Sequence, residues 1–134
     1  MLVAIVSDIH GNRQAFESVL EEIADSDCQE LWCLGDLVGY GADPDVCVEL
    51  ARRHASICLA GNHDLGVRGT LPLELFSRGA ELAARWTQAT ITPRTREYLE
   101  RLEPAQLDEA VGLYHASPRD PVWEYVLSAL QAEL

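Results

Sequence analysis

The stretch LVAIVSDIHGN at residues 2–12 decides the predicted fold of this chain. Its apolar part, Leu2 to Val6, has the length and composition of a buried strand. Asp8 and His10 follow directly, and from Asn12 to Asp25 the apolar residues recur at the spacing of a helix. The sequence therefore predicts a strand, a polar loop and a helix, in that order.

The same order of strand, loop and helix recurs further along the chain. Leu31 to Leu34 predicts a second strand, and Ile57 to Ala60 predicts a third. Between them, Asp43-Pro44 predicts the start of a helix towards Arg53, because Asp is favoured at the N-cap and Pro at the first helical position. Strands that alternate with helices indicate an α/β fold with a parallel sheet covered on both faces.

The second half of the chain continues this pattern. It predicts helices over Leu73–Gln88 and Thr95–Leu102, a strand over Ala110–Tyr114 and a last amphipathic helix over Val122–Leu134. Neither an internal repeat nor a Gly/Ser-rich linker interrupts the 134 residues, so we expect residues 1–134 to form a single domain.

Composition disfavours several classes of partner. With 10 Lys and Arg against 22 Asp and Glu, the net charge of −12 disfavours binding to nucleic acid. No apolar run approaches the roughly 20 residues that cross a bilayer, so neither a membrane partner nor a signal peptide is expected. The four cysteines form no Cys-x-x-Cys pair, which favours reduced thiols and a cytoplasmic location.

Polar side chains follow the end of each predicted strand. In chain order they are Asp8 and His10, then Asp36, then Asn62, His63 and Asp64, and finally His115. The loops after the carboxyl ends of parallel strands share one edge of the sheet, so these side chains are expected to meet. Carboxylates, imidazoles and a carboxamide form a mixed N/O set that suits Zn, Mn, Fe or Ni. The sequence thus predicts a metal centre.

Each of these residues also has a simpler interpretation when it is taken alone. Asp36 could cap a turn, and Asn62 could only tolerate a left-handed backbone. His115 could be a hydrogen-bonded core residue. The occurrence of all the motifs after consecutive strands favours the metal centre over these alternatives.

Four segments carry a resemblance to a known family. Ser7–Asn12, Gly35–Gly41 and Gly61–Asp64 resemble the first three signature blocks of the calcineurin-like metallophosphoesterases, and His115–Pro121 resembles the fourth. The chain is most similar to the small bacterial and archaeal phosphodiesterase-like branch. The resemblance implies the N-terminal part of a four-layer α/β/β/α sandwich.

The resemblance also implies a role for each site residue. Asp8 and His10 would hold one divalent metal ion, Asn62 and His115 would hold the other, and Asp36 would bridge the two. His63 would stay free of the metals, to bind a phosphate oxygen or to protonate the leaving alkoxide, with Asp64 orienting it.

The implied activity is metal-dependent hydrolysis of phosphodiesters or small phosphomonoesters, with Mn, Ni, Fe or Zn as the ions. Family members continue into a Gly-His-x-His motif, but no histidine follows His115 in this chain. Each metal would then lack one imidazole. The alternative function is therefore a catalytically weak or inactive metal-binding module. We also expect an uncovered sheet face, which would favour a homo-oligomer.

Overall fold

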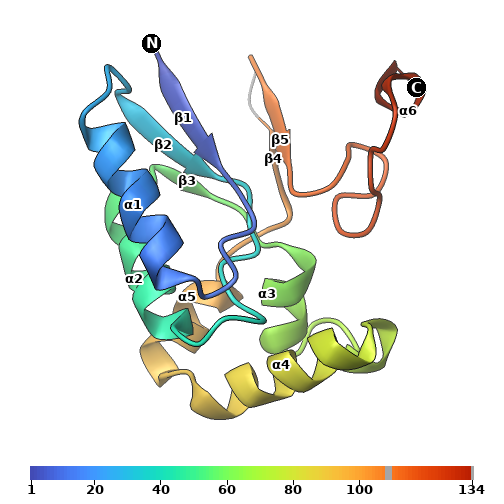
Figure 1. Cartoon of the computed structure of the whole chain (residues 1–134). Coiled ribbons are helices and arrows are strands. Elements are labelled where there is room, and N and C mark those ends of the chain that lie inside the picture. The colour runs from blue at the N-terminus through green and yellow to red at the C-terminus, as the bar shows by residue number, and fades with distance from the viewer. Residues whose placement is uncertain (108–109, 134) are drawn as a thin grey trace.

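A three-stranded parallel sheet organises the first half of the chain. The computed structural model describes residues 1–107 and 110–133. Strands β1 (Val3–Val6), β2 (Glu30–Cys33) and β3 (Ile57–Cys58) pair in parallel in the order β1-β2-β3. Helices α1 (Arg13–Ala24) and α2 (Pro44–His54) connect the strands and lie on the same side of the sheet (Figure 1). The predicted α/β class with a parallel sheet is confirmed.

The two faces of this sheet differ in burial. Leu31 and Cys33 alternate with more exposed neighbours on β2 and are buried in the core. On the opposite face, Ile5 pairs in register with Trp32 and is 57% exposed. The expectation that helices cover both faces is therefore wrong for the described residues, because both crossover helices lie on one side.

The predicted helix over Leu73–Gln88 is interrupted near its start. The chain forms a short 3-10 helix, η1 (Leu73–Leu75), and then α4 (Arg78–Thr90). Phe76 between them is extended, and the Ser77 side chain accepts a backbone N–H from the first turn of α4. A serine N-cap of this kind starts a new helix, which explains the interruption.

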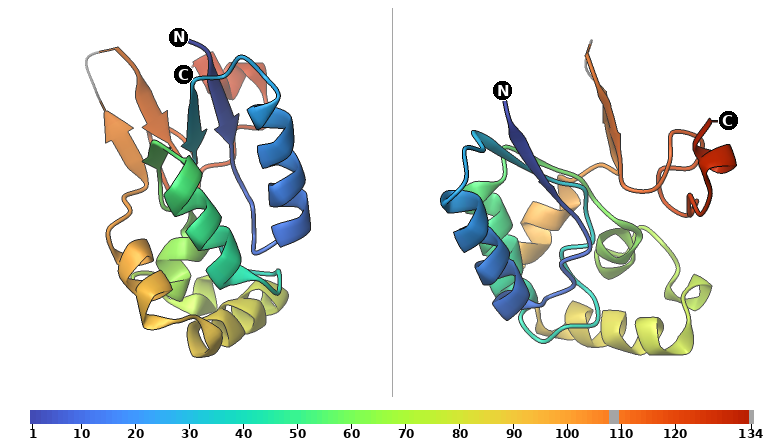
Figure 2. Two further views of the ribbon diagram at one scale, coloured as in Figure 1. Left: turned by 90° about the vertical axis from the view of Figure 1, so that its left-hand side faces the viewer. Right: turned by 45° about the horizontal axis from the view of Figure 1, so that its top comes forward.

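A two-stranded antiparallel sheet follows helix α5 (Pro93–Glu100), which corresponds to the predicted Thr95–Leu102 helix. Strand β4 (Ala105–Leu107) was not predicted, and it pairs with β5 (Gly112–Tyr114), the last part of the predicted Ala110–Tyr114 strand. The hairpin stands next to the β3 side of the parallel sheet (Figure 2).

The last predicted helix is mostly absent. Only α6 (Ala129–Glu133) is helical within the expected range Val122–Leu134, and Leu134 itself lies outside the described residues. The backbone N–H groups of Val122 and Trp123 both bond to the Asp120 side chain at 3.0 Å, which holds this part of the chain in a turn.

The core lies between the helices and the parallel sheet. Its members come from residues 9–102 and include Phe16, Val48, Leu65 and Leu99. Among the helices of residues 1–107 and 110–133, none has the length and apolarity needed to span a membrane.

Candidate metal centre

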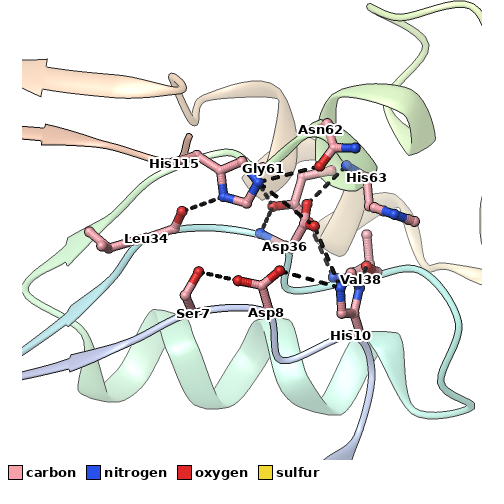
Figure 3. A network of polar contacts seen from close by, with 11 residues as sticks. Ser7, Asp8, His10, Leu34, Asp36, Val38, Gly61, Asn62, His63 and His115 are labelled. Atoms are coloured by element: carbon pink, nitrogen blue, oxygen red, sulfur yellow. Dashed lines mark hydrogen bonds and ion pairs between the residues drawn. The ribbon is translucent and has the colours of Figure 1, made fainter. Parts of the chain in front are cut away.

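The site lies where the strands of the parallel sheet end. Asp8 and His10 follow β1, Asp36 follows β2, and Asn62 opens the short helix α3 (Asn62–Val67) after β3. His115 arrives from the other sheet, directly after β5. Figure 3 shows these five side chains converging, as the sequence predicts, although α3 itself was not predicted.

Backbone hydrogen bonds join the first two loops. The N–H groups of Asp8, His10 and Gly11 donate to the carbonyls of Gly35, Asp36 and Leu37 at 3.0, 2.9 and 2.8 Å. The loops therefore extend the β1–β2 pairing beyond the strands. The side chains that they carry are held at a fixed separation.

Several site residues adopt a left-handed backbone that side chains disfavour. The φ angles are +57° at Asp8, +50° at His10, +56° at Asp36 and +60° at Tyr40. Such conformations persist where the surrounding structure enforces them, and they cluster at functional sites. Their position at three of the predicted ligands supports a functional purpose for these loops.

Two close backbone approaches explain the glycines here. A Cβ at Gly61 would lie 2.0 Å from Asp36 Oδ1, and a Cβ at Gly35 would lie 2.5 Å from the backbone nitrogen of Gly61. Larger residues at either position would separate the Asp36 loop from the start of α3.

Asp36 is the centre of the arrangement. One oxygen, Oδ2, lies 3.5 Å from His10 Nε2 and 3.8 Å from His115 Nε2. The other, Oδ1, accepts the backbone N–H of His63 at 2.9 Å. Burial, together with the nearby charge of Asp64, raises the pKa of Asp36 to about 7. A raised pKa of this kind means that the contacts within the protein alone stabilise the negative charge of this buried carboxylate poorly.

The two imidazoles are oriented in the same way. His10 Nδ1 lies 3.0 Å from the carbonyl oxygen of Val38, and His115 Nδ1 lies 2.7 Å from that of Leu34. A carbonyl only accepts, so each ring donates from Nδ1. In the neutral rings this leaves the Nε2 lone pair directed at the site, which is the usual arrangement of a metal-ligating histidine.

Each Nε2 atom faces a further oxygen. Asp8 Oδ1 lies 3.6 Å from His10 Nε2, and Asn62 Oδ1 lies 3.3 Å from His115 Nε2. Two ligands of one ion, each roughly 2.1 Å from it, lie roughly 3 to 3.5 Å apart. Lone pairs that face one another at such distances fit a cation between them, so the residues fit the implied metals.

Asp8 and His10 also affect each other's charge. When the His10 ring is protonated on both nitrogens, its contact with Asp8 is the main reason why the pKa of Asp8 is lowered to about 2. Burial alone would lower the pKa of His10, but the Asp8 contact and the charge of Asp36 outweigh it and raise that pKa. Ser7, which the sequence analysis did not single out, donates its hydroxyl to Asp8 Oδ2 at 2.6 Å.

His63 lies beside the centre with a ring that is held by packing. Its centroid lies 4.8 Å from those of His10 and Tyr40 and 5.1 Å from that of Phe76. The buried Nδ1 atom has no hydrogen-bond partner. Burial lowers the pKa of His63 to about 4, so the ring is neutral at pH 7. Side-chain atoms of His10, Asp36 and His63 lie within 4.8 Å of one another, close enough to hold an ion.

Asp64 does not have the contact that the family resemblance implies. It was expected to orient His63, but its carboxylate accepts backbone N–H groups from Asp36, Gly61 and Val38 at 2.7, 2.9 and 3.1 Å. Helical geometry turns adjacent side chains in different directions, so neighbours in sequence do not face each other. Asp64 therefore joins the loops after β2 and β3.

A segment that sequence analysis did not assign to the site closes one side of it. A cavity of about 200 Å³ is lined by four of the predicted ligands, Ala116 and residues 122–126. Its role at the site was missed because the sequence predicts a helix over this segment. Its closeness in sequence to His115 could have indicated that it lies next to the site.

Comparisons with known proteins agree with this geometry. The family model for calcineurin-like phosphoesterases matches residues 1–120. The uncharacterized protein MJ0912 of Methanocaldococcus jannaschii is 37% identical over 131 residues, which are 93% of this chain and 54% of that protein. A symmetrical bis(5'-nucleosyl)-tetraphosphatase of Ectopseudomonas mendocina is 39% identical over 71 residues, covering 48% of this chain and 25% of the relative.

A solved structure is similar over nearly the whole chain. The metallophosphoesterase from Sphaerobacter thermophilus has a TM-score of 0.78 and 40% identity, covering 92% of this chain and 50% of that one. The chain thus spans about half the length of these two relatives. From the matched family model and these relatives, the chain belongs to the calcineurin-like phosphoesterase family.

Proposed function

We propose that this chain binds two divalent metal ions and hydrolyses phosphodiesters or small phosphomonoesters. The observation that carries the proposal is the position of Asp36 Oδ2, which faces Nε2 of both His10 and His115 at 3.5 and 3.8 Å. A carboxylate oxygen shared by two imidazoles supports a bridging role for Asp36.

The ligands divide into two groups around that bridge. Asp8 and His10 would hold one ion, and Asn62 and His115 would hold the other. When bound, two divalent cations would neutralise phosphate charge and acidify a water molecule for attack on phosphorus. The carboxamide of Asn62 adds an oxygen ligand without adding negative charge, which leaves the centre attractive to phosphate.

His63 is proposed to act on the substrate rather than on the metals. Its ring packs against His10 with centroids 4.8 Å apart, next to the proposed first metal site. A neutral imidazole carries one N–H, which can donate to a phosphate oxygen. The ring can protonate the leaving alkoxide only after its own pKa rises, and bound phosphate charge would raise it.

The substrate class is a further part of the proposal. Relatives that match half of this chain are symmetrical bis(5'-nucleosyl)-tetraphosphatases, which supports a phosphate ester with a nucleoside group among the substrates to test. All described cysteines are free, and this supports the proposed cytoplasmic location.

Metal analysis and turnover together test the proposal. The chain is loaded with manganese and assayed on bis(p-nitrophenyl) phosphate and on p-nitrophenyl phosphate. We expect two ions per chain and measurable hydrolysis, with both reduced in His115→Ala. His54→Ala is the matched control, because His54 is exposed at the end of α2. Two bound ions without turnover would favour the inactive metal-binding module. Failure to bind metal would contradict both the phosphoesterase and the metal-binding module.

A further inference from the structure

The cavity next to the metal centre has two unlike walls. One wall consists of side chains assigned to the metals, namely Asp8, Asp36, Asn62 and His115. The facing wall is a continuous segment, residues 122–126, with Ala116 at its edge. A phosphate held at the first wall would place its ester group beside this segment.

The facing wall is rich in aromatic and apolar side chains. It contains Trp123 and Tyr125, with Val122 and Val126 beside them. Tyr125 lines the cavity yet is 72% exposed, which leaves its ring accessible to a ligand. Flat aromatic rings stack well on such side chains.

Trp123 is held in place from behind. Its ring packs against Phe76 with centroids 5.1 Å apart and an angle of 60° between the planes. Phe76 packs in turn against His63 at 5.1 Å. The wall is thereby connected to the residue proposed to contact phosphate, so both are positioned by one row of rings.

The turn before the wall is also rigid. The Asp120 side chain accepts the backbone N–H groups of Val122 and Trp123 at 3.0 Å each. Ser117 Oγ accepts those of Arg119 and Asp120 at 3.2 and 3.1 Å. A ligand that bound here would find the wall already ordered, which lowers the entropy cost of binding.

The charges around the wall disfavour an anionic group. The negative charge of Glu124 is compensated by Arg119, whose Nη2 lies 2.6 Å from Glu124 Oε1. The cavity otherwise contains the carboxylates of Asp8 and Asp36, and the protein has a net charge of −12. A second anionic group away from the metals would therefore be repelled.

We propose that residues 122–126 form a subsite for the organic group of the phosphate ester, and that this group is a neutral aromatic ring such as a nucleobase. The inference rests on the proposed function, because the metal centre would hold the phosphate. It goes further by assigning the ester specificity to Trp123 and Tyr125.

Binding measurements on the manganese-loaded chain test this subsite. Isothermal titration compares inorganic phosphate, ribose 5-phosphate and adenosine 5'-monophosphate. Stacking on one aromatic side chain is worth about 1–3 kcal/mol, so adenosine 5'-monophosphate should bind on the order of tenfold more tightly than ribose 5-phosphate. Trp123→Leu and Tyr125→Leu should each reduce that preference.

Two matched variants serve as controls. Trp86 is a 46% exposed tryptophan on α4, and Leu127 is exposed just after the wall, but neither lines the cavity. Trp86→Leu and Leu127→Ala should keep the full preference. Should Trp123→Leu unfold because it loses the Phe76 contact, Tyr125→Leu decides the matter, since its exposed ring contributes little to folding.

The outcomes separate the subsite from the metal centre. Equal affinity for adenosine 5'-monophosphate and ribose 5-phosphate, with inorganic phosphate still bound, would overturn the subsite and leave the proposed function standing. A preference that survives in both Trp123→Leu and Tyr125→Leu would also overturn it. Absence of phosphate binding in the parent chain would overturn the subsite and the proposed function together.

Discussion

The carboxylate of Asp64 accepts the backbone N–H of Asp36 at 2.7 Å, so one buried acid holds the loop that carries another. Asp64 is fully buried and also accepts the N–H groups of Val38 and Gly61. Three donors from two loops thus converge on one side chain. The integrity of the site depends on a residue that is not one of the proposed metal ligands.

Asp64→Asn is expected to destabilise the protein by about 2–4 kcal/mol. The amide replaces an accepting oxygen with a donor, which leaves buried backbone N–H groups unpaired at about 1–3 kcal/mol each. Urea unfolding measures the change. Asp43→Asn is the control, because Asp43 makes no side-chain cap hydrogen bond, and it should change stability by no more than about 0.5 kcal/mol. Equal effects in the two variants would contradict the anchoring role.

Asp36→Asn is expected to lower metal content more than any other single ligand change. Its carboxylate is proposed to contact both ions, whereas Asp8→Asn removes an oxygen from one site only. Elemental analysis of the manganese-loaded variants gives the ions bound per chain. If Asp36→Asn retained two ions, the bridging role would be wrong.

His63→Ala is expected to keep the parent metal content while lowering turnover by about 10²–10⁴-fold, the usual contribution of general acid catalysis. The assay is hydrolysis of bis(p-nitrophenyl) phosphate at saturating manganese, with His54→Ala as the control. The side-chain atoms of His63, His10 and Asp36 lie within 4.8 Å of one another, so a ligand role is the competing prediction. Loss of an ion from His63→Ala would establish that competing role.

Without metal, the contribution of Asp36 to the stability of the protein is expected to fall as the pH rises from about 4 to about 7. Burial raises the pKa of Asp36 from 3.8 to about 7, so the folded state retains a proton that the unfolded state releases. This stabilisation is fully present below the pKa that Asp36 has in the unfolded state. It is lost as the pH rises through the pKa of about 7 that Asp36 has in the folded state. The free energy of unfolding is measured in excess EDTA across this range.

The matched comparison isolates Asp36 from the other groups that titrate nearby. His63 acts in the opposite direction, because its lowered pKa costs stability as the pH falls below 6.5. Asp36→Asn retains His63 but removes the carboxyl, so the parent should lose stability relative to this variant as the pH rises. Parallel pH profiles for the two proteins would show that Asp36 titrates normally.

Sequence analysis predicts the site better than it predicts what supports the site. The positions of Asp8, Asp36 and Asn62 follow from strands whose ends are marked by polar residues. The hydrogen-bond partners of Asp64 cannot be predicted in this way, because the N–H donors at Asp36 and Val38 lie 28 and 26 residues away in the chain. Local sequence patterns cannot identify such distant contacts. The adjacency of Asp64 to His63 in the sequence suggested a contact between these two side chains instead.

The same limit explains the elements that were misjudged. Helical spacing from Val122 onwards is real, but the Asp120 side chain only closes a turn there, and no helix follows before Ala129. Residues 73–88 have helical spacing too, yet Ser77 starts a new helix within them. In both cases the apolar periodicity alone does not determine the residue at which the helix begins.

The arrival of His115 from a separate hairpin has a consequence for the order in which the site is assembled. Asp8, His10 and Asp36 lie in loops that follow adjacent strands, whereas His115 Nδ1 reaches the Leu34 carbonyl across 81 residues of chain. Contacts between distant parts of a sequence form late, because the intervening loop must first be closed. A chain leaving the ribosome would therefore assemble the ligands proposed for one cation before those proposed for the other, so the two proposed sites would be separated in time as well as in space.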